Sequence, residues 1–281
     1  MSGWAIRVPG SSANLGAGFD VLAMAVSLHA EVGTGEPPAD GHVADDHHPA
    51  AIAFRDLGGT GPLWTRTSIP MGRGLGFSGA VRVGGAAAAV VQRHGRDALH
   101  DPSHRHRVLA VAARLERHAD NAAASLEGGI VAVAGETVTR IPVAFDAAVL
   151  AWIPSGTTTS TDRSRTALGA TVTREDAVFN LGRVASFVAA CAIGDPSRLR
   201  IATEDRLHQP TRLPGVPRSA AALAAALDAG VWAAWLSGSG PTVAMLCEPA
   251  RAEQLAAALP DDGHTKVLRI DHAGATVVDR E

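Results

Sequence analysis

Apolar residues up to about position 153 occur in short runs that glycine, proline or charged residues interrupt. These runs predict β-strands at 4–8, 21–32, 130–133 and 147–153. Small residues predict a loop at 9–18, and residues 33–62 predict a loop-rich segment because they hold many glycines and prolines and show little periodicity. Residues 104–117 predict a helix.

A glycine-rich turn and a long apolar run follow Ile69 and Pro70. Glycines stand at 72, 74 and 76, and an alanine- and valine-rich stretch continues to about Val91 without a proline, which predicts a buried helix. Glycines at a helix start let backbone N–H groups approach phosphate oxygens, and the helix dipole favours an anion there. A turn that serves only tight packing of the helix would show the same glycines. The turn lacks the GK[ST] ending of a Walker P-loop.

In the second half of the chain, patterns that predict helices alternate with patterns that predict strands. Helices are predicted at 174–192, 218–229 and 250–259. Strands are predicted at 231–236, 241–247 and 265–270. This alternation predicts an α+β fold in layers, and the proline-containing break before 147 predicts a domain boundary near residue 144, dividing the chain into 1–144 and 145–281.

Charge and length narrow the class of protein. The 281 residues suffice for two ordinary domains. The 25 basic and 28 acidic residues are interleaved, with a formal net charge of -3, so no binding surface for nucleic acid or a membrane is expected. No apolar run reaches the roughly 18 residues of a membrane helix. Lys266 is the only lysine, which argues against mechanisms that depend on an invariant lysine.

The cysteines and the N-terminus point to a cytoplasmic protein. Cys191 and Cys247 lie far apart and outside any CxxC or histidine-rich spacing, so they predict buried apolar residues and not a disulfide framework or a zinc site. The first residues lack the basic and apolar regions of a secretory signal.

Three spaced motifs carry a family resemblance. VPGSSANLGAGFD at 8–20, the glycine turn at 70–80 and LSGSGPT at 236–242 resemble, in this order, the three motifs of homoserine kinases in the GHMP superfamily. Between them, residues 116–121 resemble the family's EGHPDN segment, and Glu204 to Arg212 resemble its ED-x-LHQP-x-R segment. Ser160, Thr161 and Arg165 resemble its ST-x-x-x-R segment. The resemblance extends from about residue 5 to about residue 250.

The resemblance implies a fold and a reaction. The fold is the two-domain GHMP architecture, with an N-terminal α+β domain that holds nucleotide and a C-terminal ferredoxin-like domain. The reaction is transfer of the γ-phosphate of ATP to the side-chain hydroxyl of homoserine, in threonine synthesis. Mg²⁺ is expected with ATP, because charge spreads over the γ-phosphate oxygens during transfer. The partner is a small-molecule substrate, and a homodimer is possible.

The resemblance also implies site residues. Those expected to hold ATP are Pro70, Gly72, Arg73, Gly74, Leu75, Gly76, Ser78, Gly79 and Ala80. Those expected to hold Mg²⁺ are Ser78 and Glu116. Those expected to bind the substrate are Asn14, Asp20, His118, Asn121, Arg165 and Arg212. Those expected to take part in catalysis are Asn121, Thr161 and Arg165.

The chemistry of homoserine suits these residue types. Arginine binds a carboxylate at two points, which fits Arg165 and Arg212, and Asp20 suits the ammonium group. Asn121 is expected to orient the hydroxyl, and Thr161 to bond the hydroxyl or the phosphate. The base stays open between direct proton transfer to the γ-phosphate and Asp120, which equally suits a helix cap.

The chain departs from the family pattern in three places. The loop that normally reads GLGSSAA has Phe77 in place of a small hydroxyl residue, Ala119 replaces a proline, and the segment 33–68 is shorter than usual. If the Phe77 ring points into the helix-packing layer, nucleotide binding survives; if it points into the phosphate cavity, binding is weakened. Two further functions stay open: a kinase of another small carboxylate-bearing alcohol, and a catalytically silent ligand-binding relative.

Overall fold

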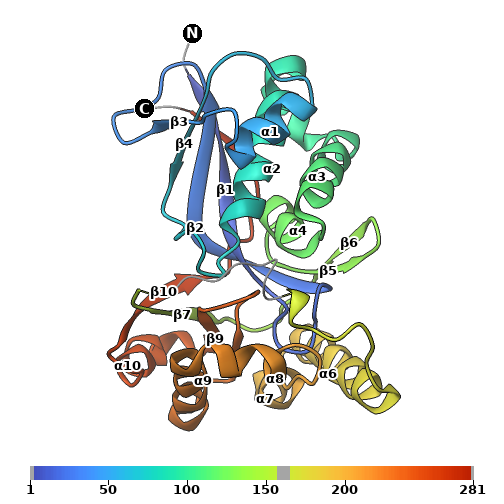
Figure 1. The fold of residues 1–281 in the computed structure, drawn as a ribbon, viewed down its shortest axis with the longest axis vertical. Helices are drawn as coiled ribbons and strands as arrows, with labels where there is room; N and C mark the ends of the chain where they lie inside the picture. The colour runs from blue at the N-terminus through green and yellow to red at the C-terminus, as the bar shows by residue number, and fades with distance from the viewer. Residues whose placement is uncertain (1–2, 157–164, 280–281) are drawn as a thin grey trace.

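The computed structural model describes residues 3–156 and 165–279 and contains two antiparallel sheets, one above the other in Figure 1. Among these residues the upper sheet has seven strands. They are β1 (Trp4–Ala13), β2 (Leu22–Thr34), β3 (His42–Val43), β4 (Leu63–Thr67), β5 (Ile130–Ala134), β6 (Thr137–Ile141) and β11 (Thr276–Asp279). The order along the main path is β11-β1-β2-β4-β3, and β5 pairs with β2 and β6.

Strand β1 is longer than predicted, because it continues through the first part of the segment expected to be a loop. Its register against β2 shifts between Pro9, which is opposite His29, and Gly10, which is opposite Val26. A bulge at this point lets an extended strand accept a proline and bend without losing its partner. The loop between the two strands is therefore shorter than the sequence predicted.

Helices α1 to α4 cover one face of the upper sheet (Figure 1). They are α1 (Pro49–Asp56), α2 (Phe77–His94), α3 (Pro102–Glu116) and α4 (Asp120–Glu127), with a 3-10 turn at Arg96–His100. Helices α2 and α4 contact both β1 and β2. The buried residues of α2 are alanine, valine and glycine, and these small side chains let the helix lie close to the sheet and to α1. The predicted helices at 77–91 and 104–117 are thus confirmed.

The segment 33–62, predicted to be loop-rich, contains α1 and β3. Helix α1 has only eight residues, begins with a proline and has its first turn capped by the His48 side chain, which accepts from Ala50 N. Its buried residues, Phe54 among them, pack against α2. So short a helix gives no clear periodicity and is held by tertiary packing, which is why the sequence pattern missed it. Helix α4, the strand β4 and the edge strands β6 and β11 were missed as well.

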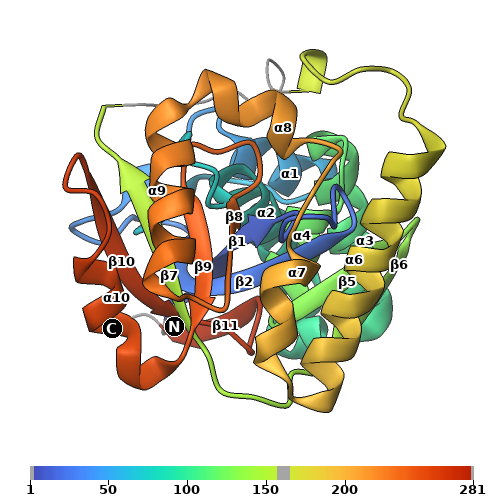
Figure 2. The ribbon, with the colours of Figure 1, turned by 90° about the horizontal axis from the view of Figure 1, so that it is seen from below.

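The lower sheet has the ferredoxin-like order. Its strands are β7 (Ala148–Pro154), β8 (Ala233–Leu236), β9 (Val243–Cys247) and β10 (Gly263–Arg269). They lie in the order β10-β7-β9-β8, with helices connecting the first strand to the second and the third to the fourth. The helices are α6 (Arg174–Ile193), α7 (Leu199–Ala202), α8 (Gln209–Arg212), α9 (Pro217–Ala229) and α10 (Ala252–Ala257), with 3-10 turns at Pro196–Arg198, Leu213–Gly215 and Pro249–Arg251. Figure 2 shows these helices from below.

The chain ends in the sheet in which it began. After β10 leaves the lower sheet, β11 pairs with β1, with Trp4 opposite Asp279. Residues 276–279 therefore belong to the upper sheet, although the predicted division at residue 144 groups them with the second half. An isolated antiparallel β-bridge between Val26 and Ile270 marks where the chain returns to the upper sheet. The boundary near 144 itself remains a prediction.

Helix α6 is the one helix of the described residues whose length and apolar composition would allow it to cross a membrane. Length and composition alone are weak evidence. Phe187 and Cys191 of α6 are fully buried against the rest of the protein, and Arg183 pairs with Glu204 at 2.7 Å. These contacts are those of a helix packed on a globular domain.

Both cysteines are buried and unpaired, as predicted. Burial raises the pKa of the Cys191 thiol to about 12 and that of Cys247 to about 11. Both thiols therefore keep their protons at neutral pH and serve as small apolar residues.

Candidate active site

Three loops from distant parts of the sequence meet between the two sheets. One follows β1, one precedes α2, and one connects β8 with β9. Gly238 N–H of the third loop donates to Ala13 O at 3.2 Å, and the Ser237 hydroxyl donates to Gly74 O at 2.6 Å. The three motifs singled out in the sequence therefore form one structure.

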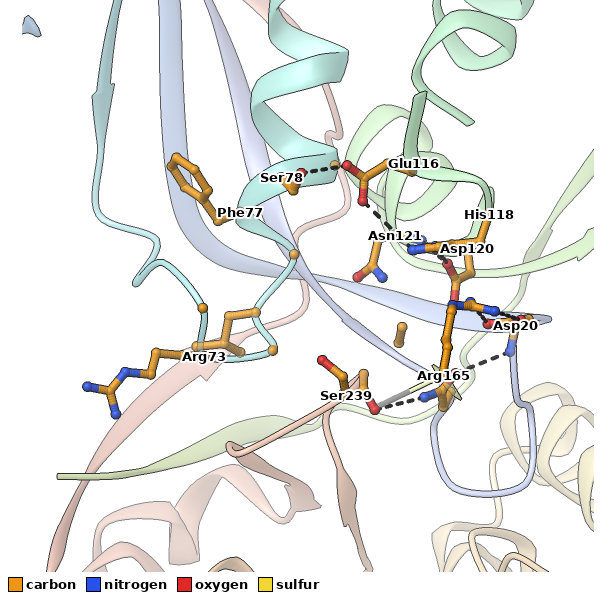
Figure 3. Close-up of a pocket in the computed structure, with 18 of the residues that line it drawn as sticks. Asp20, Arg73, Phe77, Ser78, Glu116, His118, Asp120, Asn121, Arg165 and Ser239 are labelled. Carbon is orange, nitrogen blue, oxygen red and sulfur yellow. Dashed lines mark hydrogen bonds and ion pairs between the residues drawn. The ribbon is translucent and has the colours of Figure 1, made fainter. Parts of the chain in front are cut away.

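The loops surround a cavity of about 150 Å³ (Figure 3). Most of the predicted site residues line it: Asn14, Asp20, Pro70, Gly72, Arg73, Gly74, Leu75, Gly76, Ser78, Gly79, Glu116, His118, Asn121, Arg165 and Arg212. Ala80 does not line it and is buried within α2. Thr161 lies outside the described residues.

One end of the cavity, here called the glycine end, is formed by residues 72–79 together with Glu116. Gly74 has φ +75° and Gly76 has φ +70°, in the left-handed region that favours glycine. A Cβ on Gly74 would lie 2.3 Å from Ser237 O, and one on Gly76 would lie 2.1 Å from the Ser11 hydroxyl oxygen. The turn therefore requires glycine at both positions.

The glycine turn leaves the start of α2 open to a ligand. Gly76 is the N-cap residue, and no side chain of the described residues caps the helix. The first intrahelical bond runs from Ala80 N to Gly76 O at 2.9 Å, so the N–H groups of residues 77–79 have no partner within the helix. Residues 77–79 line the cavity, and the positive end of the helix dipole lies at this end of α2. This is the geometry of an anion site.

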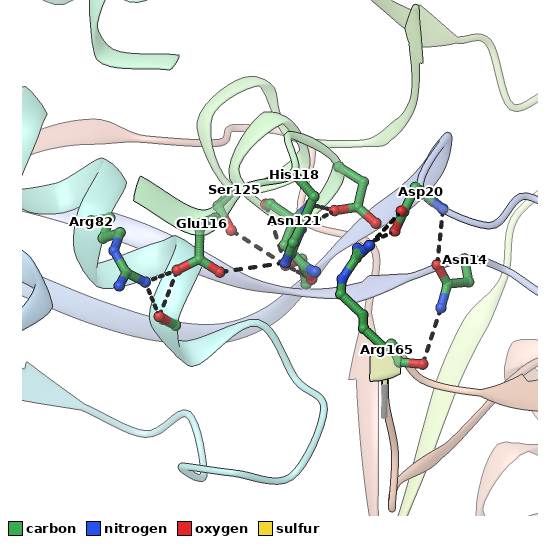
Figure 4. Close-up of polar contacts among 12 residues, drawn as sticks. Asn14, Asp20, Arg82, Glu116, His118, Asn121, Ser125 and Arg165 are labelled. Carbon is green, nitrogen blue, oxygen red and sulfur yellow. Dashed lines mark hydrogen bonds and ion pairs between the residues drawn. The ribbon is translucent and has the colours of Figure 1, made fainter. Parts of the chain in front are cut away.

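Ser78, Arg82 and Glu116 form a polar cluster beside this helix start. Figure 3 labels Ser78 and Glu116, and Figure 4 labels Arg82 and Glu116. The Ser78 hydroxyl donates to the Glu116 carboxylate at 2.6 Å. Arg82, one turn further along α2, donates to the Ser78 hydroxyl and pairs with the Glu116 carboxylate. Burial lowers the pKa of Arg82 from its usual value, and its Nε has no hydrogen-bond partner among the described residues.

The turn between α3 and α4 places three further side chains in the cavity. Arg117 has φ +66°, which ends α3 and turns the chain so that His118 and Asp120 approach the cavity. His118 Nδ1 and Asp120 Oδ1 are 2.7 Å apart, and Asn121 N donates to the same oxygen at 2.8 Å. The Asn121 side-chain oxygen accepts from the Ser11 hydroxyl at 2.8 Å, which leaves its amide nitrogen free to donate. Asp120 thus both satisfies the start of α4 and lines the cavity.

The other end of the cavity, here called the arginine end, is formed by Asp20, Arg165, Arg212 and Phe19. Arg165 binds the Asp20 carboxylate with two hydrogen bonds, of 2.8 and 2.5 Å. The guanidinium carbon of Arg165 lies 5.6 Å from the centre of the Phe19 ring, and that of Arg212 lies 5.2 Å from it. One aromatic ring thus positions both arginines.

Asn14 connects the arginine end to the loop after β8. Its side-chain oxygen accepts from Asp20 N at 3.2 Å, and its side-chain nitrogen donates to Gly238 O at 3.0 Å. Asn14 and Asp20 have φ values of +74° and +59°, a conformation that asparagine and aspartate tolerate better than most residues.

The buried residue His208 supports the side chain of Arg212. Its Nη1 donates to Gly238 O at 3.1 Å and lies 3.3 Å from His208 Nδ1. His208 Nε2 lies 2.9 Å from Gly16 O, which makes Nε2 the donor and Nδ1 the acceptor facing the arginine. Burial lowers the pKa of His208, and burial with the nearby charge of Arg165 lowers that of Arg212. His208 is therefore neutral at pH 7.

Phe77 and Arg73 both line the cavity, but their side chains point away from its centre (Figure 3). In Figure 3 the Phe77 ring lies on the side of the helix start opposite Glu116 and Asn121. The ring packs against the hydrophobic core and makes an edge contact with His48, with 6.4 Å between ring centres. Arg73 extends outward, and its Nη1 donates to Pro154 O at 2.6 Å. Arg73 thus contributes backbone, not its charge, to the cavity.

Sequence reasoning missed Phe19, Arg82 and His208. Phe19 and His208 lie within matched motifs, and their rings stack with 5.3 Å between centres. The family resemblance assigned neither residue to the substrate, so only the packing in the structure reveals their contacts with the arginines. Arg82 is a charged residue within a run of apolar residues on α2. A charge at a position predicted to be buried was the one feature of the sequence that could have indicated a special role for it.

The donors at the glycine end suit a magnesium ion. Ser78 and Glu116 supply a hydroxyl and a carboxylate oxygen within 2.6 Å of each other, and hard oxygens of this kind bind Mg²⁺ together with water and phosphate. The described residues contain no group of three or more histidines, cysteines, aspartates or glutamates able to hold a metal by themselves. An ion held by Ser78 and Glu116 would complete its coordination with water or with phosphate oxygens.

The two sheets and the open helix start at a glycine turn define a GHMP kinase. The family model described as GHMP kinases C terminal matches residues 187–265. A solved structure of homoserine kinase from Cytophaga hutchinsonii is similar with a TM-score of 0.83 at 24% identity, and covers 99% of this chain and 98% of its own. A structure of a putative homoserine kinase from Listeria monocytogenes has a TM-score of 0.78 at 27% identity, with coverage of 99% and 100%.

Sequence comparison gives the particular family. Homoserine kinase of Moorella thermoacetica is 39% identical over 303 residues, which cover 97% of this chain and 99% of the relative. Homoserine kinase of Thermus thermophilus is 38% identical over 290 residues, covering 94% and 95%. The chain belongs to the homoserine kinase family. The predicted α+β GHMP fold and the family resemblance are thereby confirmed.

Proposed function

We propose that this protein transfers the γ-phosphate of ATP to the side-chain hydroxyl of L-homoserine and forms O-phosphohomoserine for threonine biosynthesis. The observation that carries the proposal is one cavity with an anion site at one end and a paired carboxylate and arginine at the other. The two ends match the two substrates, a triphosphate and a zwitterionic amino alcohol.

The arginine end suits an amino acid. Arg165 and Asp20 neutralise each other in the absence of a ligand, and Arg212 stands beside them with an unpartnered Nε among the described residues. A zwitterion brings one carboxylate and one ammonium group, so it can replace the Arg165–Asp20 contacts without leaving either charge unpaired. We assign the substrate carboxylate to the two arginines and the ammonium group to Asp20. An alcohol without these charges would have to break the pair without compensation.

The glycine end suits the phosphates of ATP. The free N–H groups at the start of α2 are expected to bind phosphate oxygens, and Ser78 with Glu116 are expected to hold Mg²⁺. When bound, Mg²⁺ would neutralise charge on the phosphates and orient them. The ring of Phe77 leaves this end accessible, which favours an active kinase over a silent relative.

The residues between the two ends are proposed to handle the hydroxyl. Asn121 has its side-chain oxygen occupied by Ser11, so its amide nitrogen is the group that can donate to the substrate oxygen and orient it. An amide cannot accept the proton. Asp120 is buried with one oxygen bonded to His118 and Asn121, and its second oxygen is the candidate acceptor within the described residues. Direct transfer of the proton to the γ-phosphate stays the alternative, and Thr161 keeps its proposed role beside the hydroxyl.

We also propose a cytoplasmic location, a possible homodimer and the domain division at residue 144. Sedimentation of the purified protein would test the dimer.

The test is an ADP-release assay with purified protein, ATP, Mg²⁺ and a matched set of alcohols. L-homoserine is expected to be the best acceptor. Homoserine amide, which lacks the carboxylate charge, and 4-hydroxybutyrate, which lacks the ammonium group, should each react poorly. Comparable rates for all three would refute the assignment of the arginine end, and absence of ADP release with every alcohol would favour a silent binding protein.

A further inference from the structure

Arg82 lies where a cation would bind, between the two residues proposed as magnesium ligands. It follows Ser78 by one helical turn on α2, so both side chains emerge on the same face. Its guanidinium contacts the Ser78 hydroxyl and, at the same time, the Glu116 carboxylate, the pair labelled in Figure 4. The carboxylate that is expected to attract Mg²⁺ is therefore already paired with a positive charge of the protein.

The surroundings make this pairing strong and specific. The side chains of Arg82 and Glu116 are only 18% and 10% exposed, so water screens their charges weakly. The Arg82 Nε has no hydrogen-bond partner among the described residues, and the guanidinium makes its described polar contacts with Ser78 and Glu116 alone. Nothing else in the described structure draws this arginine into the cluster.

We propose that Arg82 competes with the divalent cation for Ser78 and Glu116. While nucleotide is absent, Arg82 neutralises Glu116 and repels a free ion, so the pair binds free Mg²⁺ weakly. A triphosphate brings enough negative charge to offset both cations, and the ion then binds together with the nucleotide. This inference rests on the magnesium site proposed above.

Mn²⁺ binding tests the proposal without any measurement of turnover. Mn²⁺ replaces Mg²⁺ as the probe, and electron paramagnetic resonance measures the free ion during titration of the nucleotide-free protein. Arg82→Met keeps the length of the side chain and removes its charge, and it should bind Mn²⁺ at least about tenfold more tightly than the wild type, because the repelling charge is gone. Arg82→Lys keeps a charge and should stay close to the wild type. Equal affinities of Arg82→Met and the wild type would overturn the proposal.

Two controls locate the effect. Arg93→Met removes an exposed arginine of the same helix and should leave Mn²⁺ affinity unchanged. Adding Glu116→Gln to Arg82→Met should abolish the gain, and a gain that persists would place the ion elsewhere and overturn the proposal. Melting curves verify folding, and Arg82→Gln replaces Arg82→Met if the latter does not fold.

A nucleotide arm separates this proposal from the proposed metal site. With a non-hydrolysable ATP analogue, wild-type affinity for Mn²⁺ should rise more than that of Arg82→Met. If Glu116→Gln leaves Mn²⁺ binding in the presence of the analogue unchanged, the metal site itself is wrong. If Glu116→Gln weakens that binding but Arg82→Met leaves free-ion affinity unchanged, the metal site stands and only the role of Arg82 fails.

Discussion

The glycine end of the cavity is built mostly from backbone, whereas the arginine end is built from charged side chains that both sheets contribute. At the glycine end, a turn and one helix start provide adjacent N–H groups, and Ser78 is two residues from the N-cap. At the arginine end, Asp20 follows β1 while Arg212 ends α8, far along the chain and in the lower layer. Apart from Glu116, the glycine end is contiguous in sequence, whereas the arginine end exists only when the two layers come together.

Both ends nevertheless neutralise their own charges in the absence of a ligand. Arg82 pairs with Glu116 at one end, and Arg165 pairs with Asp20 at the other. The Arg82–Glu116 pair is buried, so an unpaired charge there would destabilise the protein, whereas the Arg165 and Asp20 side chains are each about one third exposed. We therefore expect ligands at both ends to replace existing contacts. Charged ligands that match both pairs can do this, and neutral ones cannot. We therefore expect selectivity to come from exchange of partners at each end.

The largest effect is expected from Glu116→Gln, which removes the carboxylate of the glycine end and keeps its shape. Turnover should fall by about three orders of magnitude, because the only charged ligand proposed for Mg²⁺ is lost. The measurement is ADP release at rising Mg²⁺, which should restore activity only in part. Glu136→Gln, an exposed glutamate between β5 and β6, is the matched control. Normal turnover of Glu116→Gln at limiting Mg²⁺ would remove Glu116 from the site.

Arg212→Ala tests the arginine end. The KM for homoserine should rise roughly 10- to 150-fold, which corresponds to about 1.5–3 kcal/mol for a hydrogen bond to a charged group, while the KM for ATP changes little. Steady-state kinetics with each substrate varied in turn give both values. Arg198→Ala, an exposed arginine of the lower layer, controls for a general loss of charge. Equal changes in both KM values would show that the two ends are not independent.

Phe77→Ser tests whether the glycine end depends on backbone alone. The ring is partly buried and packs on the core, so its loss should lower the free energy of unfolding by about 2 kcal/mol, less than for a fully buried aromatic residue. Binding of Mg-ATP should stay within about twofold of the wild type, because the ring lies away from the helix start. Melting curves and nucleotide titration measure the two effects. Tighter ATP binding by Phe77→Ser would mean that the ring obstructs the phosphates, and would favour a silent or repurposed relative.

The smallest effect concerns His208, which supports Arg212. Burial lowers the pKa of His208 in the folded protein below 6.5, the ordinary pKa of histidine. As the pH falls below 6.5, the unfolded chain therefore takes up a proton at His208 before the folded protein does. The stability that the neutral ring provides is complete above pH 6.5 and is lost as the pH falls below it. The melting temperature should therefore fall between pH 7.5 and 5.5 in the wild type, and fall less steeply in His208→Gln. Identical slopes would show that another group causes the acid sensitivity.

The sequence alone predicted the glycine turn, the helix after it and the family. The turn at 72–76 and the helix after it can be read directly, because the glycines, the N-cap and the free N–H groups are neighbours along the chain. The longer helices and the central strands were predicted for a similar reason, since their apolar periodicity is local. The arginine end was named by resemblance and not by any property of the residues themselves.

Tertiary structure decided the features that depend on contacts between distant segments. The pairing of Arg165 with Asp20, and the position of Phe19 between two arginines, follow from the docking of the lower layer on the loop after β1. The pairing of β11 with β1 and the packing of the short helix α1 have the same cause, because neither segment has enough local pattern to specify its own structure. The position of Arg82 is the clearest case: its sequence neighbours predict only a buried helix, and the nearness of the end of α3 turns a buried charge into a partner of Glu116.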